Sequence, residues 1–389
     1  WVSQDISRSP RQVSIVDGRS PAKTTIYLVD RDNPESEFLA EASSIIRAGG
    51  LVVFPTETVY GLGADALNPY AVERIFRVKG RPPDNPLIVH IAVHDDLFIL
   101  GKGIDWRAEA LAKKFWPGPL TLVVPRSNKL PAITVAGLDT VAIRMPRHPV
   151  ALGLIRLSGV PIAAPSANLS GRPSPTTADH VIRDLADRVD AILDAGPTDI
   201  GVESTVIDLT SEPPQVLRPG GVTVEELRAV VGEVDLHPLV TGAPIGDLVA
   251  KSPGMKYRHY APRAKVVVVV GEAGEIKQAV QLLAAHLRRR FRVGVLGTDG
   301  HRYEADALRD LGPRSSPSGA AQRLFRYLRE LDDEGVDIIV AEGWPEEGIG
   351  LAIMNRLRKA AGGLVIPADR VLRETPTISS YLRYGVMGT

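Results

Sequence analysis

Short apolar runs alternate with amphipathic stretches along most of the chain, and this alternation is typical of an α/β protein. We expect strands from the apolar runs at 24–29, 51–54, 87–91, 120–124, 140–145, 159–168, 191–194, 202–208, 215–221, 265–270, 293–296 and 337–341. We expect helices from the amphipathic stretches at 34–48, 71–78, 106–115, 177–185, 223–231, 275–289, 318–331 and 350–361. Asn33 precedes the first of these helices and is predicted to cap it.

The same pattern divides the chain into four segments. Residues 1–23 are polar and show no periodicity, which predicts a flexible extension. Residues 24–231 form the first predicted domain, and residues 232–262, rich in Pro, Gly and His, are predicted to link it to a second. In residues 263–389, strands alternate with helices, which indicates a smaller parallel α/β domain. The aromatic and charged end of the linker is either a solvated spacer or a lid that closes on a ligand.

Composition narrows the functional classes. Lys and Arg together number 46, as do Asp and Glu, so the net charge does not indicate a nucleic-acid partner and any RNA contact would need a local basic patch. The 389 residues include no cysteine, which excludes disulfides, thiolate metal sites and cysteine nucleophiles. The sequence has no apolar run of membrane-spanning length and no apolar core of a signal peptide, so we expect a cytoplasmic protein without membrane contact.

One stretch combines the parts of an anion-binding site. The apolar run 51–54 ends in the hydroxyl-bearing turn 55–58, and the helix predicted at 71–78 is followed by Lys79 and Arg81 on a loop stiffened by proline. Lys supplies a point charge to a phosphate and Arg a forked pair of donors. Taken alone, however, Lys-x-Arg after a helix is more often a solvated turn that complements the helix dipole.

Other polar positions are ambiguous when taken singly. Ser166 and Asn168 sit on the turn in which the run 159–168 ends, where they could bond the local backbone or a bound phosphate. Ser204 and Arg218 could be ordinary surface, and His90 within an apolar strand is more often a core histidine. The chain contains no G-x-S-x-G, no Walker A sequence and no metal-binding histidine pair, so it provides neither a recognisable nucleophile nor a protein metal site.

The combined pattern resembles a known family. PTETVYGLG at 55–63, followed by KGRPPDNPL at 79–87, resembles the YrdC-like family, specifically the threonylcarbamoyl-AMP synthases. The resemblance continues through SPGMKYRHYAP at 252–262, which points to the two-domain form. It implies a twisted α/β catalytic sheet with a concave positive face, joined to a smaller Rossmann-like domain.

The resemblance implies a reaction. Members of this family combine ATP, L-threonine and bicarbonate (or carbon dioxide) into L-threonylcarbamoyl-AMP and release pyrophosphate, with Mg²⁺ accompanying ATP. A separate tRNA threonylcarbamoyl transferase complex then modifies the adenosine beside the anticodon. The resemblance also raises the expectation of a direct contact with tRNA. The nucleophile belongs to the substrate, which agrees with a sequence that lacks a catalytic Ser-His or Cys-His set.

The resemblance also assigns roles to residues. Lys79 and Arg81 would be the catalytic cations that stabilise charge on the phosphates. Threonine would contact Thr58, His90, Arg144, Ala164 and Ser204. ATP would contact Lys79, Arg81, Asn85, Thr140, Ser166, Asn168, Ser174, Arg218, Tyr257 and His259.

A non-catalytic RNA-binding protein is the alternative from another functional class. Arg77, Lys79 and Arg81 would suit contacts with an RNA backbone equally well. This alternative does not explain the Thr, Ser and Asn turns or the linker motif. Salt-sensitive RNA binding would favour it, whereas threonine-dependent release of pyrophosphate from ATP would favour the synthase.

Overall fold

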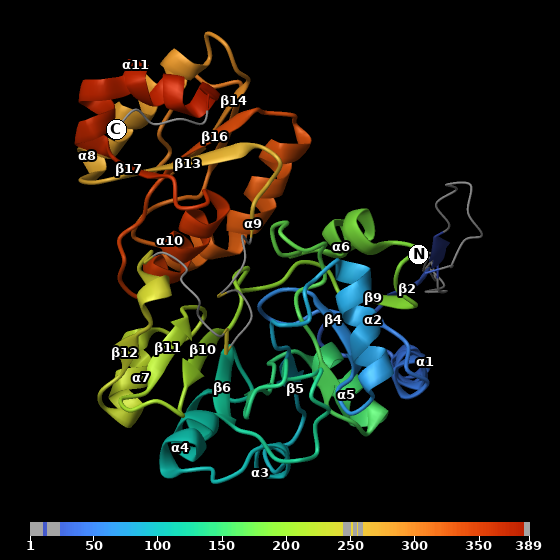
Figure 1. Ribbon diagram of the computed structural model, residues 1–389. Helices are drawn as coiled ribbons and strands as arrows, with labels where there is room; N and C mark the ends of the chain where they lie inside the picture. Colours follow the sequence, from blue (N-terminus) through green and yellow to red (C-terminus); the bar gives the residue numbers. More distant parts are fainter. Residues whose placement is uncertain (1–10, 14–23, 244–249, 252–254, 256–259, 385–389) are drawn as a thin grey trace, which may run out of the picture.

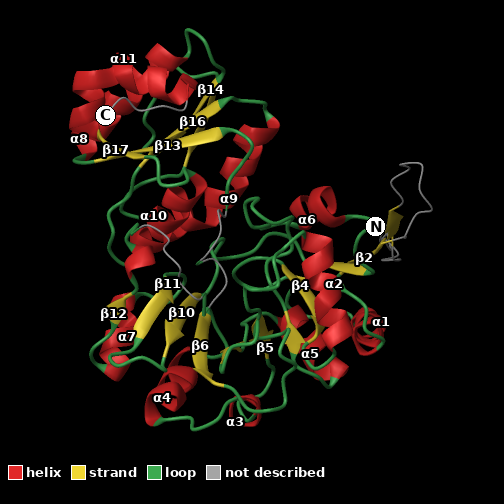
Figure 2. Cartoon of the chain, in the orientation of Figure 1, coloured by secondary structure: helices red, strands yellow, loops and turns green. Residues whose placement is uncertain are grey.

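The computed structural model describes residues 11–13, 24–243, 250–251, 255 and 260–384. These residues form two α/β units, one above the other in the view of Figure 1. The lower unit contains a mixed sheet, and the upper unit contains a smaller parallel sheet (Figure 2). None of the described helices is long and apolar enough to cross a membrane.

The first unit is built on one sheet. In the described part of the chain it has 12 strands, in the order β1-β2-β9-β3-β4-β8-β5-β7-β6-β10-β11-β12. The strands are β1 (Arg11–Val13), β2 (Thr24–Leu28), β3 (Val52–Phe54), β4 (Gly61–Asp65), β5 (Ile88–His90), β6 (Leu120–Pro125), β7 (Thr140–Arg144), β8 (Ile162–Ala163), β9 (Ala191–Asp194), β10 (Thr205–Asp208), β11 (Gln215–Arg218) and β12 (Asp235–Leu236). The helical segments are α1 (Ser36–Arg47), α2 (Pro69–Lys79), α3 (Asp96–Leu100), α4 (Trp106–Phe115), α5 (Pro149–Ser158), α6 (Ala178–Leu185), α7 (Val224–Val231) and the short η1 (Pro238–Val240).

Apolar side chains on the inner faces of these helices hold the first unit together. Ile75 of α2 and Leu111 of α4 are fully buried in the same cluster as Leu122 of β6. Ile46 of α1 and Leu154 of α5 pack in a second cluster. Removing such side chains from water is the main stabilising contribution to a core of this kind.

The second unit is a parallel sheet with helices on both faces. Its strand order is β15-β14-β16-β13-β17, and all its strand pairs are parallel. Its elements are β13 (Lys265–Val270), α8 (Ala273–Leu287), β14 (Val293–Gly297), β15 (Ala307–Asp310), α9 (Pro317–Asp333), β16 (Ile338–Glu342), α10 (Ile349–Ala360), β17 (Val365–Pro367) and α11 (Ala368–Tyr384). Side chains of α9 and α10 share one apolar cluster, and those of α8 and α11 share another. The small parallel α/β domain expected from the sequence is therefore present, whereas β15, β17 and α11 were not predicted.

One local prediction is wrong, and one strand of the first unit was missed. The first helix begins at Ser36 with Glu35 as its N-cap residue, because Asn33 belongs to a preceding turn in which its N–H donates to the Asp30 carboxylate. No element was predicted at residues 61–65, which form strand β4 and pair with β3. A Cβ on Gly63 would lie 2.8 Å from both Phe54 and Ile162, so glycine here permits close packing of the sheet.

The two units pack directly against each other. Val59 and Val202 of the first unit belong to the same apolar cluster as Phe325 of the second. Arg329 of α9 forms an ion pair of 2.7 Å with Asp184 of α6. β1 lies within the predicted extension at 1–23, and β12 lies within the predicted linker at 232–262. The predicted limits of the two domains stay predictions.

Candidate functional site

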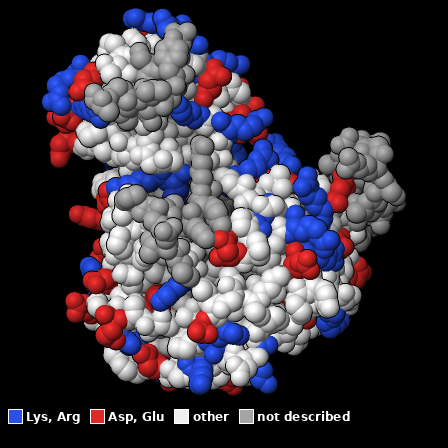
Figure 3. Space-filling model, in the orientation of Figure 1, with Lys and Arg blue, Asp and Glu red and all other residues white. Residues whose placement is uncertain are grey.

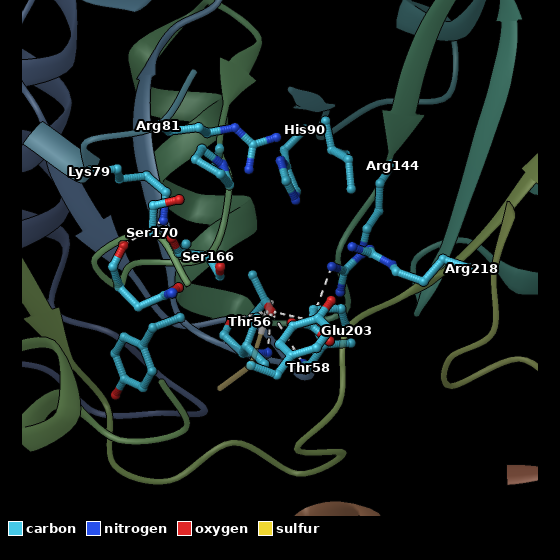
Figure 4. Close-up of a pocket in the computed structure, with 18 of the residues that line it drawn as sticks. Thr56, Thr58, Lys79, Arg81, His90, Arg144, Ser166, Ser170, Glu203 and Arg218 are labelled. Carbon is cyan, nitrogen blue, oxygen red and sulfur yellow. Dashed lines mark hydrogen bonds between the residues drawn. The ribbon is translucent and has the colours of Figure 1, made fainter. Parts of the chain in front are cut away.

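The candidate site lies over one face of the first sheet. His90 and Arg144 are register partners in the parallel β5–β7 pair, so their side chains project from the same face. With Arg218 at the end of β11 and the turn after β3, they border a hollow of about 660 Å³, including space open to solvent. Figure 4 shows Lys79 and Arg81 on one side of this hollow and Arg144 and Arg218 on the other.

Most of the predicted site residues meet in this hollow. Those that line it are Thr58, Lys79, Arg81, His90, Arg144, Ala164, Ser166, Asn168 and Arg218. They come from segments spread over more than a hundred residues of sequence, so the fold collects them. Tyr257 and His259 lie outside the described residues.

The turn after β3 presents a hydroxyl at a defined position. Thr56 donates from Oγ1 to the carbonyl of Val59 at 2.7 Å, and its Oγ1 accepts from the N–H groups of Thr58 and Val59. Such side chain-to-backbone bonds replace a regular ladder and stabilise a turn. The Thr58 hydroxyl, 2.9 Å from that of Thr56, is thereby held at the hollow.

Arg144 is held from three directions. Its guanidinium lies 2.8 Å from the Glu57 carboxylate, donates to Thr58 Oγ1 at 3.0 Å and donates from Nε to the Gly118 carbonyl at 3.3 Å. Arg144 is 3% exposed and Glu57 is fully buried. Because a buried charge needs a partner, Glu57 both neutralises and orients this guanidinium.

Lys79 ends α2 and points back into the turn that carries Ser166 and Asn168. Its Nζ donates to the carbonyls of both residues at 2.5 Å, which leaves one of its three N–H groups for a ligand. Gly80, with φ of 61°, ends the helix in the left-handed region and so turns the chain toward Arg81. Burial, and then the positive charge of Arg81, hold the pKa of Lys79 well below its usual value. An anion beside Lys79 would favour the charged form of this lysine and so raise its pKa.

Arg81 is positioned by the loop that follows it. Its guanidinium donates to the carbonyls of Asn85 and Pro86, each at 3.2 Å. The Asn85 side chain is fully buried, and both ends of its amide lack a hydrogen-bond partner within the described residues. Buried amides are normally paired, so this one is available to a bound polar group.

His90 is a buried neutral side chain. Burial, and then the neighbouring Arg144, lower its pKa to about 3. It is 3% exposed and meets the edge of Phe54 at a centroid distance of 6.0 Å. It therefore offers a neutral imidazole to the hollow rather than a positive charge.

Among the predicted residues that the structure describes, four do not line the hollow. Asn85 accepts a hydrogen bond from Arg81 through its backbone carbonyl. Ser204 accepts from Arg218 at 3.1 Å and shares a hydrogen bond with Thr121, and Ser174 donates to Glu203. Both serines therefore support lining residues. Thr140 begins β7, at the opposite end of the strand from Arg144.

The sequence analysis did not select every polar lining residue: Thr56, Ser170, Glu203 and Tyr260 are among those it missed. Thr56 and Glu203 lie within stretches that the sequence analysis had singled out, at 55–63 and 202–208. The sequence did not show which side chains these two residues would contact. Tyr260 lies in the linker motif, next to the residues that were selected. It is 4% exposed and has φ of 64°, the left-handed region that a bulky side chain rarely adopts. Backbone strain of this kind is invisible in the sequence.

Family models match both units. A model described as telomere recombination matches residues 44–220, and a model described as the threonylcarbamoyl-AMP synthase C-terminal domain matches residues 222–362. The threonylcarbamoyl-AMP synthase of Pyrococcus abyssi is 53% identical, over 88% of this chain and 99% of its own length. That of Bacillus subtilis is 50% identical, over 84% and 94%.

A solved structure is similar over both units. The crystal structure of P. abyssi Sua5 complexed with L-threonine matches with a TM-score of 0.84 at 52% identity, over 88% of this chain and 99% of that one. This confirms the predicted fold class, an α/β fold with a YrdC-like domain and a second, smaller domain. Because the relatives over most of the chain are threonylcarbamoyl-AMP synthases, the protein is an enzyme of the nucleotidyltransferase class. The chain belongs to the threonylcarbamoyl-AMP synthase family. The alternative of a non-catalytic RNA-binding protein is therefore not retained.

Proposed function

We propose that this enzyme makes L-threonylcarbamoyl-AMP from ATP, L-threonine and bicarbonate or carbon dioxide, with release of pyrophosphate. One observation carries the proposal: Lys79, Arg81, Arg144 and Arg218, from four separate segments, border one hollow together with the Thr58 hydroxyl. Four cations around one space suit a nucleotide and a carboxylate, which together bring several negative charges. The L-threonine complex of the P. abyssi relative supports the same substrate here.

The chemistry needs no nucleophile from the protein. The amine of threonine adds to carbon dioxide and loses a proton, which gives a carbamate. A carbamate oxygen attacks the α-phosphorus of ATP, a new P–O bond forms, and the bond to pyrophosphate breaks. The protein would hold the reactants in line and stabilise charge on the departing pyrophosphate, which is how most phosphoryl-transfer sites work.

The residues divide between the two substrates. Arg144 and Thr58 would bind the carboxylate and hydroxyl of threonine, and the neutral His90 would border that subsite. Lys79 and Arg81 would bind the phosphates, with Arg218 on the far side. Asn85, which accepts from Arg81, has amide groups that a polar ligand or a displaced backbone group could satisfy.

Mg²⁺ would arrive with ATP rather than in a site made by protein side chains. Among the described residues, no group of three or more His, Asp or Glu side chains is placed to hold a metal ion. The carboxylates of Glu57 and Glu203 are both engaged by arginines. When bound to the phosphate oxygens, Mg²⁺ would neutralise part of their charge.

The product would serve tRNA modification. Threonylcarbamoyl-AMP is a mixed anhydride, so it is an activated donor that a second enzyme can use to acylate a nucleophile. We propose that a tRNA threonylcarbamoyl transferase complex transfers the group to the adenosine beside the anticodon. The test is to add the transferase complex and tRNA to the reaction and look for threonylcarbamoyladenosine in the digested tRNA.

The synthase reaction has a direct test. Pyrophosphate release from ATP is measured with bicarbonate and Mg²⁺, with and without L-threonine, for the wild type, Lys79→Ala and the control Lys113→Ala. Lys113 is exposed on α4, away from the hollow. We expect threonine-dependent release that is lost in Lys79→Ala and kept in Lys113→Ala. Pyrophosphate release that does not depend on L-threonine, or that is equal in all three proteins, would contradict the proposal.

A further inference from the structure

Arg356 is an unusual residue for a domain interface. It lies on α10 of the second unit, yet it is the largest fully buried side chain among the described residues. In Figure 1, α10 lies at the base of the second unit, next to β10 and β11 of the first. A guanidinium is rarely buried completely unless its donors are satisfied and its charge is paired.

Both conditions are met by atoms of the first unit. Arg356 Nε donates to the Glu203 carboxylate at 3.0 Å, and Nη1 donates to the Pro219 carbonyl at 2.6 Å. Its guanidinium carbon lies 5.5 Å from the ring centre of Tyr260, within cation–π range. Arg356 therefore joins two loops of the catalytic sheet and the end of the linker.

Each of these partners is part of the candidate site or next to it. Glu203 and Tyr260 line the hollow, and Pro219 directly follows the lining residue Arg218. Glu203 also accepts the hydroxyl of Ser174. Burial on its own would raise the pKa of Glu203, but the charges of Arg356 and Arg218 hold it below its usual value. The carboxylate therefore stays ionised between the two arginines.

The two loops have little room to move independently. A Cβ on Gly220 would lie 2.3 Å from the Glu203 carbonyl and from the amide nitrogen of Thr205, so the two backbones are in direct contact. Arg218 donates to the Ser204 carbonyl and hydroxyl, each at 3.1 Å. A shift of Glu203 would therefore be transmitted to Arg218, the cation that faces Lys79 and Arg81 across the hollow.

We propose that Arg356 is a positioning residue of the active site: it holds Glu203 and the loop after β11 in the arrangement that receives ATP. The second domain would then complete the nucleotide subsite from behind, and catalysis would require it to be docked. This inference rests on the proposed function, since it assigns the ATP subsite to the same hollow.

A second interface arginine provides the matched control. Arg329 of α9 is also buried and also donates to the first unit, to the Asp184 carboxylate and the Pro173 carbonyl. Neither of these partners lines the hollow. Arg356 and Arg329 therefore make comparable domain contacts, but only Arg356 reaches lining residues.

The experiment compares Arg356→Lys, Glu203→Gln, the double variant and Arg329→Lys. Lys cannot reproduce the two-sided contact of a guanidinium, and Gln keeps the volume of Glu but not its charge. Calorimetry measures Kd for a non-hydrolysable ATP analogue and for L-threonine, thermal unfolding measures Tm, and pyrophosphate release measures kcat and KM. If Arg356→Lys does not fold, Glu203→Gln tests the same contact from the first unit.

We expect Arg356→Lys and Glu203→Gln each to weaken binding of the ATP analogue about tenfold, with L-threonine binding nearly unchanged. The double variant should be no worse than the weaker-binding single variant, because both substitutions remove one shared interaction. Arg329→Lys should lower Tm to a similar extent while it keeps the affinity for ATP. The inference is overturned if Arg356→Lys lowers Tm but leaves ATP binding unchanged, or if the two effects add. A wild type without threonine-dependent pyrophosphate release would instead count against the proposed function, and the ATP-binding comparison would still decide the role of Arg356.

Discussion

Arg144 and Glu57 form an ion pair of 2.8 Å in which both side chains are almost completely buried. One side of the Arg144 guanidinium is therefore already paired with Glu57 before any ligand binds. A substrate carboxylate would share the guanidinium of Arg144 with Glu57. The position of Glu57 therefore fixes which side of this guanidinium faces the substrate. Removing one partner of such a pair lowers the free energy of unfolding by more than the pair itself contributes, because the remaining charge is buried without a partner.

Glu57→Gln should therefore weaken threonine binding. The amide keeps the size of the carboxylate but cannot balance the charge of Arg144, so we expect KM for L-threonine to rise about tenfold with a smaller change in KM for ATP. Steady-state kinetics of pyrophosphate release measure both constants. Glu109→Gln, an exposed change in the first turn of α4, should leave both unchanged. Equal increases in both KM values would mean that Glu57 supports the whole site rather than Arg144.

Thr58 offers a test at the level of one hydroxyl. Its Oγ1 accepts a hydrogen bond from Arg144 at 3.0 Å and borders the hollow. Thr58→Ser keeps this oxygen and Thr58→Val replaces it with a methyl group of similar size. We expect L-threonine affinity to fall about tenfold in Thr58→Val and to stay near wild type in Thr58→Ser, since a buried donor on Arg144 is left unmatched only in the valine variant. Isothermal calorimetry with L-threonine measures this, and equal losses in both variants would contradict the prediction.

ATP binding should draw a proton onto Lys79. Burial, and then Arg81, lower the pKa of this lysine in the free protein, while Asp184 and Glu203 only partly oppose them. Phosphates favour the charged lysine and so raise its pKa, which means that binding takes up a proton between the free and bound pKa values and that affinity falls as the pH rises through that range. Calorimetry in buffers of different ionisation enthalpy measures the uptake. Lys79→Met should show none, and uptake that persists in this variant would assign it to another group.

The protein should lose stability in acid through its buried histidines. The backbone N–H of Thr176 donates to Nδ1 of His180, and that of Val150 donates to Nδ1 of His148, so both rings are held neutral. Burial, and then Arg329 for His180 and Arg31 for His148, lower the pKa values to about 3 and about 4, from an ordinary 6.5. Below pH 6.5 the unfolded chain binds more protons than the folded one. The free energy of unfolding should therefore fall with decreasing pH, by at most about 1.4 kcal/mol per pH unit for each histidine.

Urea unfolding at several pH values between about 4 and 7 measures this slope. His180→Asn retains an acceptor for Thr176 but does not titrate, so its stability should depend less on pH than that of the wild type. An unchanged slope in His180→Asn would show that another group causes the acid sensitivity.

The distribution of charge over the surface bears on whether tRNA, a large anion, could bind. Acidic and basic side chains are interspersed over much of the face in Figure 3, with basic side chains gathered where the two units meet. The equal totals of acidic and basic residues therefore do not describe the local surface. A direct contact with tRNA stays a prediction.

The sequence by itself determined much of the local structure. The apolar periodicity predicted most strands and helices, including α4 at Trp106–Phe115, because side-chain spacing depends on the backbone of each element alone. The turn hydroxyls and the Lys79–Arg81 pair could also be found, since short motifs preserve their own geometry. Only the tertiary structure decided how these pieces combine: Glu57 against Arg144, and Arg356 against Glu203 from 153 residues away. Such pairs depend on long-range packing and on the need to compensate a buried charge, and neither is encoded in the spacing of residues along the chain.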